Sequence, residues 1–369
     1  MRVVHIESGL HLYGGAQQVR YLLAGLADQG IDNVLICPRG SAIADAVGGM
    51  NGATEVIEIP MRGDLDIALP GRLRSLIETR QPDLVHVHSR RGADKFGGWN
   101  ARWAGVPAVL TRRVESAEFR TLALLKYQPY AAIIAISRAI ERELKDNMGL
   151  SERRVHYVAS GVDTERFRPA GKRGRLQARF GIPEQAITIG VVAQIIERKG
   201  HARLFGLLPP LIEANPDLHV ICFGQGPLEE ALSAQADELG ISANVHLVGF
   251  RGDLPQLMPE LDMLAHPAER EGLGVAVLEA MSCGVAVVAS EAGGLTDLVE
   301  NDQTGLAVAA DDEAGWSEAL TRLSRDPDLR ARLGTAGRQQ IEAKFSSTQM
   351  TAGNLEVYHH VMRRNYGRN

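Results

Sequence analysis

The sequence predicts an α/β protein made of two doubly wound domains, each with a parallel β-sheet covered by helices on both faces. Three observations predict this fold class. Short apolar runs rich in β-branched residues alternate with amphipathic segments. The alternation occurs twice along the chain, and an irregular polar stretch, 161–172, separates the two series. Such a rhythm is typical of parallel sheets that lie between two layers of helices.

Each series supplies its own set of expected strands. The strands expected in the first series are 3–6, 33–37, 55–59, 84–88, 108–111, 132–136 and 155–158. Those expected in the second series are 187–192, 219–223, 245–248, 263–266, 285–289 and 306–308. Apolar side chains spaced by three and four residues predict helices over 15–29, 64–80 and 137–147.

We therefore expect a first domain over 1–168 and a second over 169–345. From Asp311 onward the chain is expected to be helical. Its last segment, 348–364, is too long to serve only as a cap for the second sheet. We expect this helix to pack back on the first domain.

Composition excludes several classes of protein. The 369 residues are 45% hydrophobic and 23% charged, which is typical of globular domains. The three cysteines lie far apart without CxxC spacing, which argues against a disulfide framework or a structural zinc and favours a reducing compartment. No uninterrupted apolar run is long enough to span a bilayer, and no signal peptide pattern opens the chain. We expect a cytoplasmic protein.

The net charge of −5 conceals an asymmetry between the two halves. Residues 1–170 carry a small excess of Lys and Arg, whereas 171–345 carry an excess of Asp and Glu. A basic first domain would suit an anionic acceptor or the inner surface of the cytoplasmic membrane. The alternative interpretation is that the charge serves only solubility.

Ligands of open parallel sheets bind outside the carboxyl ends of the strands, so site residues are expected in the segments that follow strands. One of them reads HPAEREGLGVAVLEAMSCG over 266–284. Gly272 and Gly274 allow a ligand close to the backbone, and the helix expected after them presents N–H groups suited to a phosphate. Glu279 lies among apolar residues of that helix and needs a partner, a role that the vicinal hydroxyls of a ribose can fill.

The spacing of Glu271 and Glu279 resembles the E-x7-E motif of the retaining family-4 glycosyltransferases, which have the GT-B fold. The resemblance extends over essentially the whole chain. The other segments that carry it, in the family's order, are Gly14-Gly15, His86-Val87-His88, 160–163, Arg198-Lys199-Gly200-His201, 224–227, 248–250, Gly293-Gly294 and Thr304-Gly305. It implies two Rossmann-like domains facing a central cleft, with the acceptor bound by the first domain and a nucleotide sugar by the second.

The resemblance also implies roles for individual residues. Glu279 matches the acid that holds the ribose hydroxyls, and Glu271 matches the acid that contacts the transferred sugar. Lys199 matches the family's lysine beside the diphosphate, where its charge would offset the charge growing on the leaving group. The resemblance assigns His88 to contact with the reacting sugar or the acceptor. Together Glu271, Lys199 and His88 form the expected catalytic set.

Further residues are expected in binding roles. Those expected to bind the donor are Gly15, Gln194, Arg198, Gly224, Gly249, Phe250, Gly272, Leu273, Gly274, Val275 and Glu279. Those expected to bind the acceptor are Gly14, Arg90, Arg112 and Arg113. The family commonly has an arginine where this chain has Gln194, and glutamine cannot neutralise phosphate charge. Arg198 or Arg270 could supply that charge.

His86 and His88 alternate along one strand and so share a face of the sheet, which raises the question of a metal site. No third ligand with suitable spacing follows them. We therefore interpret His86 as a core histidine and expect no metal ion and no other cofactor.

The function expected from the resemblance is retaining transfer of a glycosyl unit from a nucleotide diphosphate sugar to an acceptor hydroxyl. The acceptor would be a saccharide or a lipid-linked sugar, and a phosphate group on it would give it negative charge. The reaction would serve the assembly of bacterial envelope polysaccharide or lipopolysaccharide. A UDP-sugar is slightly preferred over a GDP- or ADP-sugar, and no nucleic acid partner is expected. By the same resemblance the leaving diphosphate takes the acceptor's proton.

Of three alternative functions, two stay open and the third lacks its motif. An epimerase or phosphorylase could use the same architecture. A nicotinamide dehydrogenase would need G-x-G-x-x-G after an early strand, which 9–15 does not supply. A non-catalytic protein that binds sugar nucleotides has Gln194 as its sequence support.

Overall fold

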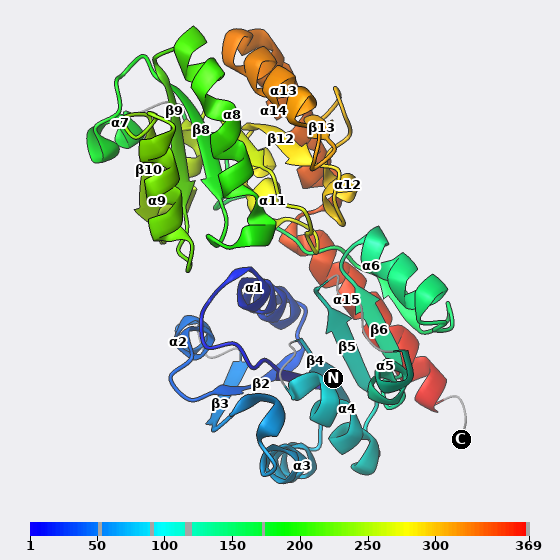
Figure 1. The fold of residues 1–369 in the computed structure, drawn as a ribbon. Coiled ribbons are helices and arrows are strands. Elements are labelled where there is room, and N and C mark those ends of the chain that lie inside the picture. Colours follow the sequence, from blue (N-terminus) through cyan, green and yellow to red (C-terminus); the bar gives the residue numbers. More distant parts are fainter. Residues whose placement is uncertain (51–53, 89–91, 115–119, 172–173, 367–369) are drawn as a thin grey trace. The chain divides into compact units, whose positions relative to one another are not determined.

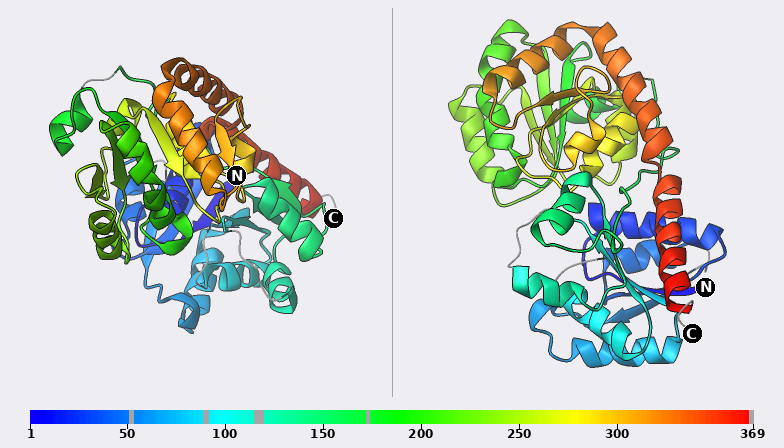
Figure 2. Two further views of the ribbon diagram at one scale, coloured as in Figure 1. Left: turned by 45° about the horizontal axis from the view of Figure 1, so that its top comes forward. Right: turned by 90° about the vertical axis from the view of Figure 1, so that its right-hand side faces the viewer.

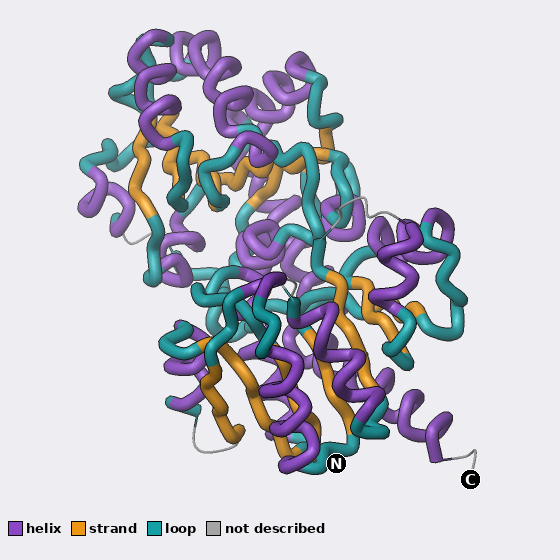
Figure 3. Tube along the Cα trace, turned by 60° about the horizontal axis from the view of Figure 1, so that its bottom comes forward, coloured by secondary structure: helices purple, strands orange, loops and turns teal. Residues whose placement is uncertain are grey.

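The structure, a computed structural model, describes residues 1–50, 54–88, 92–114, 120–171 and 174–366. The chain divides into two compact units (Figure 1). The first unit comprises Met1–Gly161 together with Ser347–Asn369, and the second comprises Val162–Ser346. Figure 3 shows the strands of each unit lying between helices. In the described helices no segment is both long and apolar enough to cross a membrane.

The first unit is built on a parallel sheet in the order β3-β2-β1-β4-β5-β6-β7. Its strands are β1 (Arg2–Ile6), β2 (Asp32–Pro38), β3 (Thr54–Ile59), β4 (Leu84–Val87), β5 (Ala108–Arg112), β6 (Ala132–Ala135) and β7 (Val155–Tyr157). Its helices are α1 (Gly14–Asp28), α2 (Ala42–Gly48), the 3₁₀ turn η1 (Gly63–Leu65), α3 (Leu69–Arg80), α4 (Ala93–Trp103), α5 (Arg120–Tyr127), α6 (Arg138–Arg142), the π turn η2 (Glu143–Asn147) and α15 (Ser347–Tyr366).

The second unit repeats this plan with a parallel sheet in the order β10-β9-β8-β11-β12-β13. Its strands are β8 (Ile187–Val192), β9 (Leu218–Phe223), β10 (Val245–Gly249), β11 (Met263–His266), β12 (Ala286–Ser290) and β13 (Leu306–Val308). Its helices are α7 (Arg175–Phe180), η3 (Glu197–Lys199), α8 (His201–Ala214), α9 (Glu229–Glu238), α10 (Leu254–Leu257), η4 (Met258–Glu260), α11 (Val275–Ser282), α12 (Leu295–Leu298), α13 (Glu313–Arg325) and α14 (Pro327–Lys344).

In both units the strand order reverses once, which defines a Rossmann-like sheet. The reversal lies between β1 and β4 in the first unit and between β8 and β11 in the second. The helices that follow the two strands at a reversal leave on opposite faces, so the ends of those strands border a crevice where ligands bind. The two sheets therefore predict one ligand position each.

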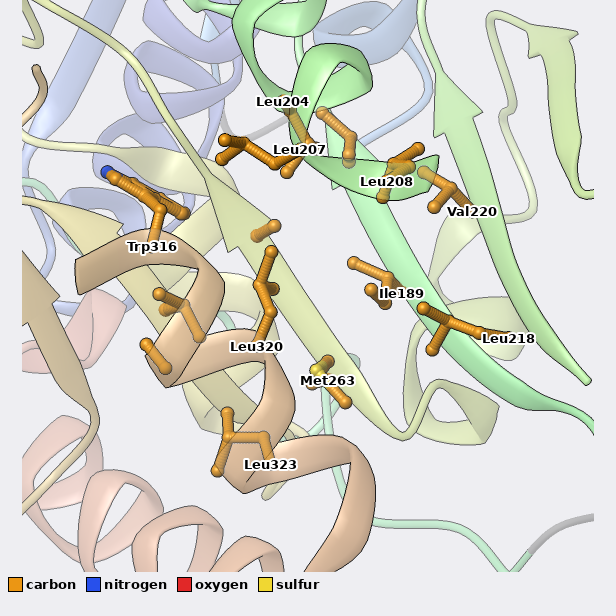
Figure 4. Close-up of a cluster of buried hydrophobic side chains, with 14 of the residues drawn as sticks. Ile189, Leu204, Leu207, Leu208, Leu218, Val220, Met263, Trp316, Leu320 and Leu323 are labelled. Atoms are coloured by element: carbon orange, nitrogen blue, oxygen red, sulfur yellow. The ribbon is translucent and has the colours of Figure 1, made fainter. Parts of the chain in front are cut away.

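The core of the second unit shows why its sequence forms these layers. Trp316, Leu320 and Leu323 recur on one face of α13 and point toward Ile189 and Met263 on the sheet (Figure 4). Leucines of α8 cover the neighbouring part of the same face. The strands that receive them are almost fully buried, which is expected of a parallel sheet covered on both sides.

The strands expected from the sequence are confirmed, with ends displaced by at most a few residues. Two expected helices differ. The segment expected as a helix over 64–80 forms η1 and then α3, because the Asp66 carboxylate accepts hydrogen bonds from the amides of Ala68 and Leu69 (3.3 and 3.1 Å) and starts the helix there. The segment expected as a helix over 137–147 begins after Ser137, whose hydroxyl accepts from the Ile140 amide at 3.2 Å, and ends in the π turn η2.

The terminal helix α15 belongs to the first unit, against which it lies in Figure 2. Tyr358 of α15 is fully buried and packs with Val3, Leu84 and Ile134 in one apolar cluster. The chain leaves the first unit after Gly161, earlier than the expected boundary at residue 168. Gly161 is held on α1 by the buried side chain of Gln18, which both donates to its carbonyl and accepts from its amide at 2.8 Å.

The contact between α1 and α15 is close enough to test. A Cβ added at Gly25 would lie 2.3 Å from the Thr351 hydroxyl oxygen. We predict that Gly25→Ala lowers the free energy of unfolding of the first unit by about 1–3 kcal/mol, as overpacking does. Chemical denaturation measures the change.

The matched control is Gly71→Ala in α3, where an added Cβ meets nothing within 4 Å. It should stabilise by roughly 0.5–1 kcal/mol, because glycine is a poor helix former. Equal effects of the two substitutions would contradict the packing of α15 on α1.

Candidate active site

The chain places an ion-paired cluster at the strand reversal of the second unit. Lys199 ends the η3 turn after β8, and Glu271 lies in the loop after β11. The Lys199 ammonium donates to the Glu271 carboxylate, and the same carboxylate oxygen contacts His266 Nε2 at 2.9 Å. Because β8 and β11 are neighbours with parallel direction, two loops far apart in sequence bring these groups together.

The cluster keeps Glu271 ionised. Burial would raise the pKa of Glu271, but the hydrogen bond from His266 and the positive charge of Lys199 outweigh it and hold the pKa well below its usual range. Burial lowers the pKa of His266, so its ring is neutral and Nε2 carries the proton that it donates. The result is a fixed carboxylate beside a nearly buried ammonium group.

Two glycines permit this geometry. Gly200, at φ 74°, follows Lys199, and an added Cβ there would lie 2.1 Å from the Pro267 carbonyl oxygen. Gly274, at φ 100°, precedes α11, and an added Cβ would lie 2.5 Å from Leu295. Both positions therefore require glycine for conformation and for space. The Gly272 amide donates to Glu271 at 3.1 Å, so the turn also positions that carboxylate.

Glu279 lies on α11 in a different environment. Its neighbours Leu278 and Ala280 are fully buried, and its own side chain is half-buried. Burial raises the pKa of Glu279 to about 8, and the charge of Arg166 only partly opposes this. In the described part of the chain the carboxyl group has no hydrogen-bond partner, so it is available to hydroxyl groups of a ligand.

The remaining residues expected to bind the donor, apart from Gly15 in the first unit, follow strands of the same sheet. Gln194 and Arg198, both exposed, follow β8, and Gly224 follows β9. Gly249 ends β10, and Phe250 after it is 60% exposed. Leu273 and Val275 lie in the turn and first turn of α11, and Leu273 is buried. Arg198 donates a hydrogen bond to the carbonyl of Arg270 at 3.2 Å. The two arginines that could supply the phosphate-neutralising charge that Gln194 lacks are therefore in contact.

The strand reversal of the first unit gathers three histidines. His88 follows β4, and its Nε2 contacts His5 Nδ1 on β1 at 2.9 Å. His86 is fully buried and contacts Tyr358 Oη at 2.5 Å and Thr111 Oγ1 at 2.7 Å, which confirms it as a core residue. Burial lowers the pKa of all three rings, that of His5 to about 4.

Gly14 and Gly15 open α1 at the same end of the sheet, after β1. An added Cβ at Gly15 would lie 3.6 Å from Arg113 Cδ, so this arginine reaches the start of α1. Burial lowers the pKa of Arg113 to about 10, and the charge of Glu7 opposes the shift. Arg113 thus lies close to Gly15, and its charge also helps to lower the pKa of His88.

The two described arginines among the four residues expected to bind the acceptor differ in burial and in their partners. Arg113 is half-buried near α1, whereas Arg112 is buried and donates to Tyr127 Oη at 2.6 Å. Arg90 lies outside the described residues. The roles of Gly14, Arg112 and Arg113 stay predictions.

Among the described residues, one group of histidines has a geometry that a metal ion could use. His5, His86 and His88 bring ligand atoms within 4.8 Å of one another. Spacing along the chain missed His5, because it lies opposite His86 on the neighbouring strand. Yet both ring nitrogens of His5 and of His86 already have hydrogen-bond partners.

The sequence also contains Asp-x-Asp at 64–66 and 326–328. Asp66 starts α3 and pairs with Arg72 at 2.5 Å, and Asp64 pairs with Lys95 at 2.7 Å. Asp326 accepts from the Leu329 amide at the start of α14. Protein groups thus engage these three aspartates, and the expectation of a metal-free site stays a prediction.

Sequence reasoning missed His266, Arg166 and His5. His266 is the last residue of β11 and the first of the segment 266–284, and this position at the carboxyl end of a strand is a signal for it. Arg166 lies in the linker near α11 and could not be located without coordinates.

The raised pKa of Glu279 predicts a pH dependence of stability. Its pKa of about 8 in the folded state exceeds the ordinary glutamate pKa of 4.5. The folded state therefore binds the proton more tightly, and the contribution to stability is lost as pH rises from about 4.5 to about 8. Glu279→Gln should flatten this decline, measured by chemical denaturation between pH 5 and pH 8.5. The exposed Glu238→Gln is the control, and an unchanged decline in Glu279→Gln would contradict the assignment.

Family models match both halves of the chain. The model of the glycosyl transferases group 1 matches residues 172–340, and that of glycosyltransferase family 4 matches residues 13–166. A D-inositol 3-phosphate glycosyltransferase of Salinispora arenicola is 30% identical over 355 residues, covering 86% of this chain and 78% of that protein. A lipopolysaccharide core biosynthesis mannosyltransferase, LpsB of Rhizobium meliloti, is 26% identical and covers 80% and 88%.

The fold has solved counterparts. The structure of HepE of Anabaena in complex with UDP superposes with a TM-score of 0.85 at 18% identity, covering 97% of this chain and all of that one. WaaG, a glycosyltransferase involved in lipopolysaccharide biosynthesis, gives a TM-score of 0.73 at 17% identity and covers 96% and 99%. The matched models, the relatives and the two Rossmann-like sheets agree, and the chain belongs to the group 1, family 4 glycosyltransferases with the GT-B fold.

Proposed function

We propose that this glycosyltransferase moves a sugar from a nucleotide diphosphate sugar to an acceptor hydroxyl with retention of anomeric configuration, in assembly of a bacterial envelope saccharide. The observation that carries the proposal is the cluster of Lys199, Glu271 and His266 at the strand reversal, beside a glycine turn and Glu279. A cation, a turn with close backbone approach and a carboxyl group free for hydroxyls are the groups that a diphosphate linked to two sugars needs.

The chemistry assigned to the donor follows from these groups. The bond between the anomeric carbon and the diphosphate oxygen breaks, and the acceptor oxygen bonds to that carbon. The acceptor's proton goes to the leaving diphosphate. Lys199 would stabilise the negative charge that grows on the diphosphate, and Glu279 would accept hydrogen bonds from the ribose hydroxyls.

A covalent double displacement is less well supported. It needs a carboxylate free to attack the anomeric carbon. Glu271 is engaged by Lys199, His266 and the Gly272 amide. These contacts suit a carboxylate that holds hydroxyls of the transferred sugar. We therefore assign Glu271 to sugar binding, with retention arising from attack on the face that the diphosphate leaves, and we propose that no metal ion takes part.

The donor is proposed to be a UDP-sugar. Support comes from HepE of Anabaena, whose solved complexes contain UDP and UDP-glucose. A thermal-shift panel of UDP, GDP and ADP with their sugars identifies the base, because binding to the native state raises the melting temperature. Release of nucleoside diphosphate that depends on acceptor, and not on inorganic phosphate, separates a transferase from a phosphorylase.

Two substitutions test the roles on the donor. Glu279→Ala should abolish the thermal shift by the nucleoside diphosphate. Lys199→Met should lower the turnover number by roughly 100-fold, the size expected when one stabilising group is removed from the leaving charge. Lys344→Met, an exposed lysine at the end of α14, is the control and should change neither. Normal turnover of Lys199→Met would refute the assignment.

The acceptor is proposed to be a saccharide carried by a lipid, reached at the cytoplasmic face of the membrane. Helix α5 is amphipathic, with Ala123 and Tyr127 buried and Leu122 and Leu125 65% and 59% exposed. The exposed Arg120 begins the helix. Apolar side chains beside a basic residue on a surface helix are typical of contact with anionic lipid. The role of the Rhizobium relative in lipopolysaccharide core biosynthesis fits such an acceptor.

We predict that replacing Leu122 and Leu125 together by serine lowers the fraction of protein that sediments with vesicles containing anionic lipid, while the thermal shift by nucleotide stays unchanged. The control is Ile67→Ser, because Ile67 is 94% exposed on a different segment. Equal loss in both variants, or none in either, would rule out α5 as the contact.

A further inference from the structure

The imidazole of His88 ends a chain of buried hydrogen bonds that starts at Asn33. The Asn33 Nδ2 group donates to the carbonyls of Leu23 and Ile31 at 3.4 and 3.2 Å. This fixes the orientation of the amide, because only its nitrogen can donate. Its oxygen, Oδ1, therefore faces His5 Nε2 at 3.2 Å.

The orientation of the amide determines the tautomer of both rings. Oδ1 can only accept, so His5 Nε2 carries a hydrogen. Burial keeps His5 neutral, with a pKa of about 4, so its Nδ1 has a lone pair. That lone pair accepts from His88 Nε2 at 2.9 Å. A neutral His88 consequently carries its hydrogen on Nε2 and a lone pair on Nδ1.

His88 Nδ1 is a buried acceptor for which the described part of the chain supplies no donor. His88 itself is only 2% exposed, so a ligand reaches Nδ1 only with a local shift of the groups around it. A buried acceptor without a partner is costly, and a hydroxyl group removes that cost. A cation would find no second free nitrogen on His5 or His86, since their ring nitrogens are already engaged.

We propose that Asn33 and His5 are positioning residues that hold His88 with its Nδ1 lone pair available to a substrate hydroxyl. The inference rests on the proposed function for the identity of the hydroxyl, which belongs to the donor sugar or the acceptor. The direction of the hydrogen bonds rests on their geometry, from Asn33 through His5 to His88, together with the burial that keeps His5 neutral. His88 lies at the strand reversal, where a ligand of this sheet binds, and within electrostatic reach of Arg113.

Nitrogen-15 NMR of histidine-labelled protein tests the tautomer directly. In the unmodified chain, His88 should show a protonated Nε2 and an unprotonated Nδ1 at pH 7. A hydrogen on Nδ1 would overturn the proposal. This readout needs no turnover, so it stands whether or not any nucleotide sugar is found to be a donor.

Two variants test the consequence. His5→Phe removes the acceptor for His88 Nε2, and Asn33→Leu removes the group that fixes His5. Each should release His88 into a mixture of tautomers and lower kcat at least about tenfold, while KM for the nucleotide sugar changes less than about twofold. Thr111→Val is the matched control, because it removes a buried partner of His86 on the neighbouring strand and leaves His88 as it was.

If His5→Phe does not fold, Asn33→Leu by itself tests whether the tautomer of His88 and kcat depend on this hydrogen-bond chain. A changed tautomer with unchanged kcat would overturn the role of the two residues. So would a loss of kcat in Thr111→Val equal to that in His5→Phe, because the effect would then be general disturbance of the core.

Discussion

The single reversal of strand order in each sheet is the constraint on which the site depends. At β8 and β11 it brings Lys199 and Glu271 into contact although they are distant in the sequence. At β1 and β4 it brings His5 and His88 together in the same way. Parallel strands end at one edge, and helices leaving on opposite faces keep that edge open between the two central strands. The polar groups at this position would otherwise lie in an apolar core.

The two glutamates of one short segment are kept in different states by their surroundings. Lys199 and His266 hold Glu271 as an anion, whereas burial among apolar neighbours favours the protonated form of Glu279. Environments that push two carboxyl pKa values apart give each group a separate task. A permanent anion can orient sugar hydroxyls. A carboxyl group that is protonated near neutral pH can both donate a hydrogen bond to a diol and accept one from it.

Much of the fold follows from the sequence, because each buried strand is a short β-branched run bounded by turn residues. The carboxyl-edge position of Glu271, Lys199 and His88 follows from the same pattern. Pairings across strands do not follow from it. His5 faces His86 through the register of β1 and β4, and Arg166 approaches Glu279 through the path of the linker. The spacing of residues along the chain predicts neither of these two contacts. The helix expected over 64–80 begins later in the structure than predicted, because the Asp66 carboxylate caps it at Leu69 although the apolar periodicity starts earlier.

The return of α15 to the first unit has a consequence for how the protein is made. The chain crosses between the units after Gly161 and again before Ser347, and Val162 and Ser346 are bridged where the two crossings meet. The ribosome therefore releases Tyr358, which closes the apolar cluster around Val3, only after the whole second unit has emerged. Until then, the apolar side chains of the first unit that pack against Tyr358 stay uncovered. The second unit, although later in the sequence, is the first that can fold to completion.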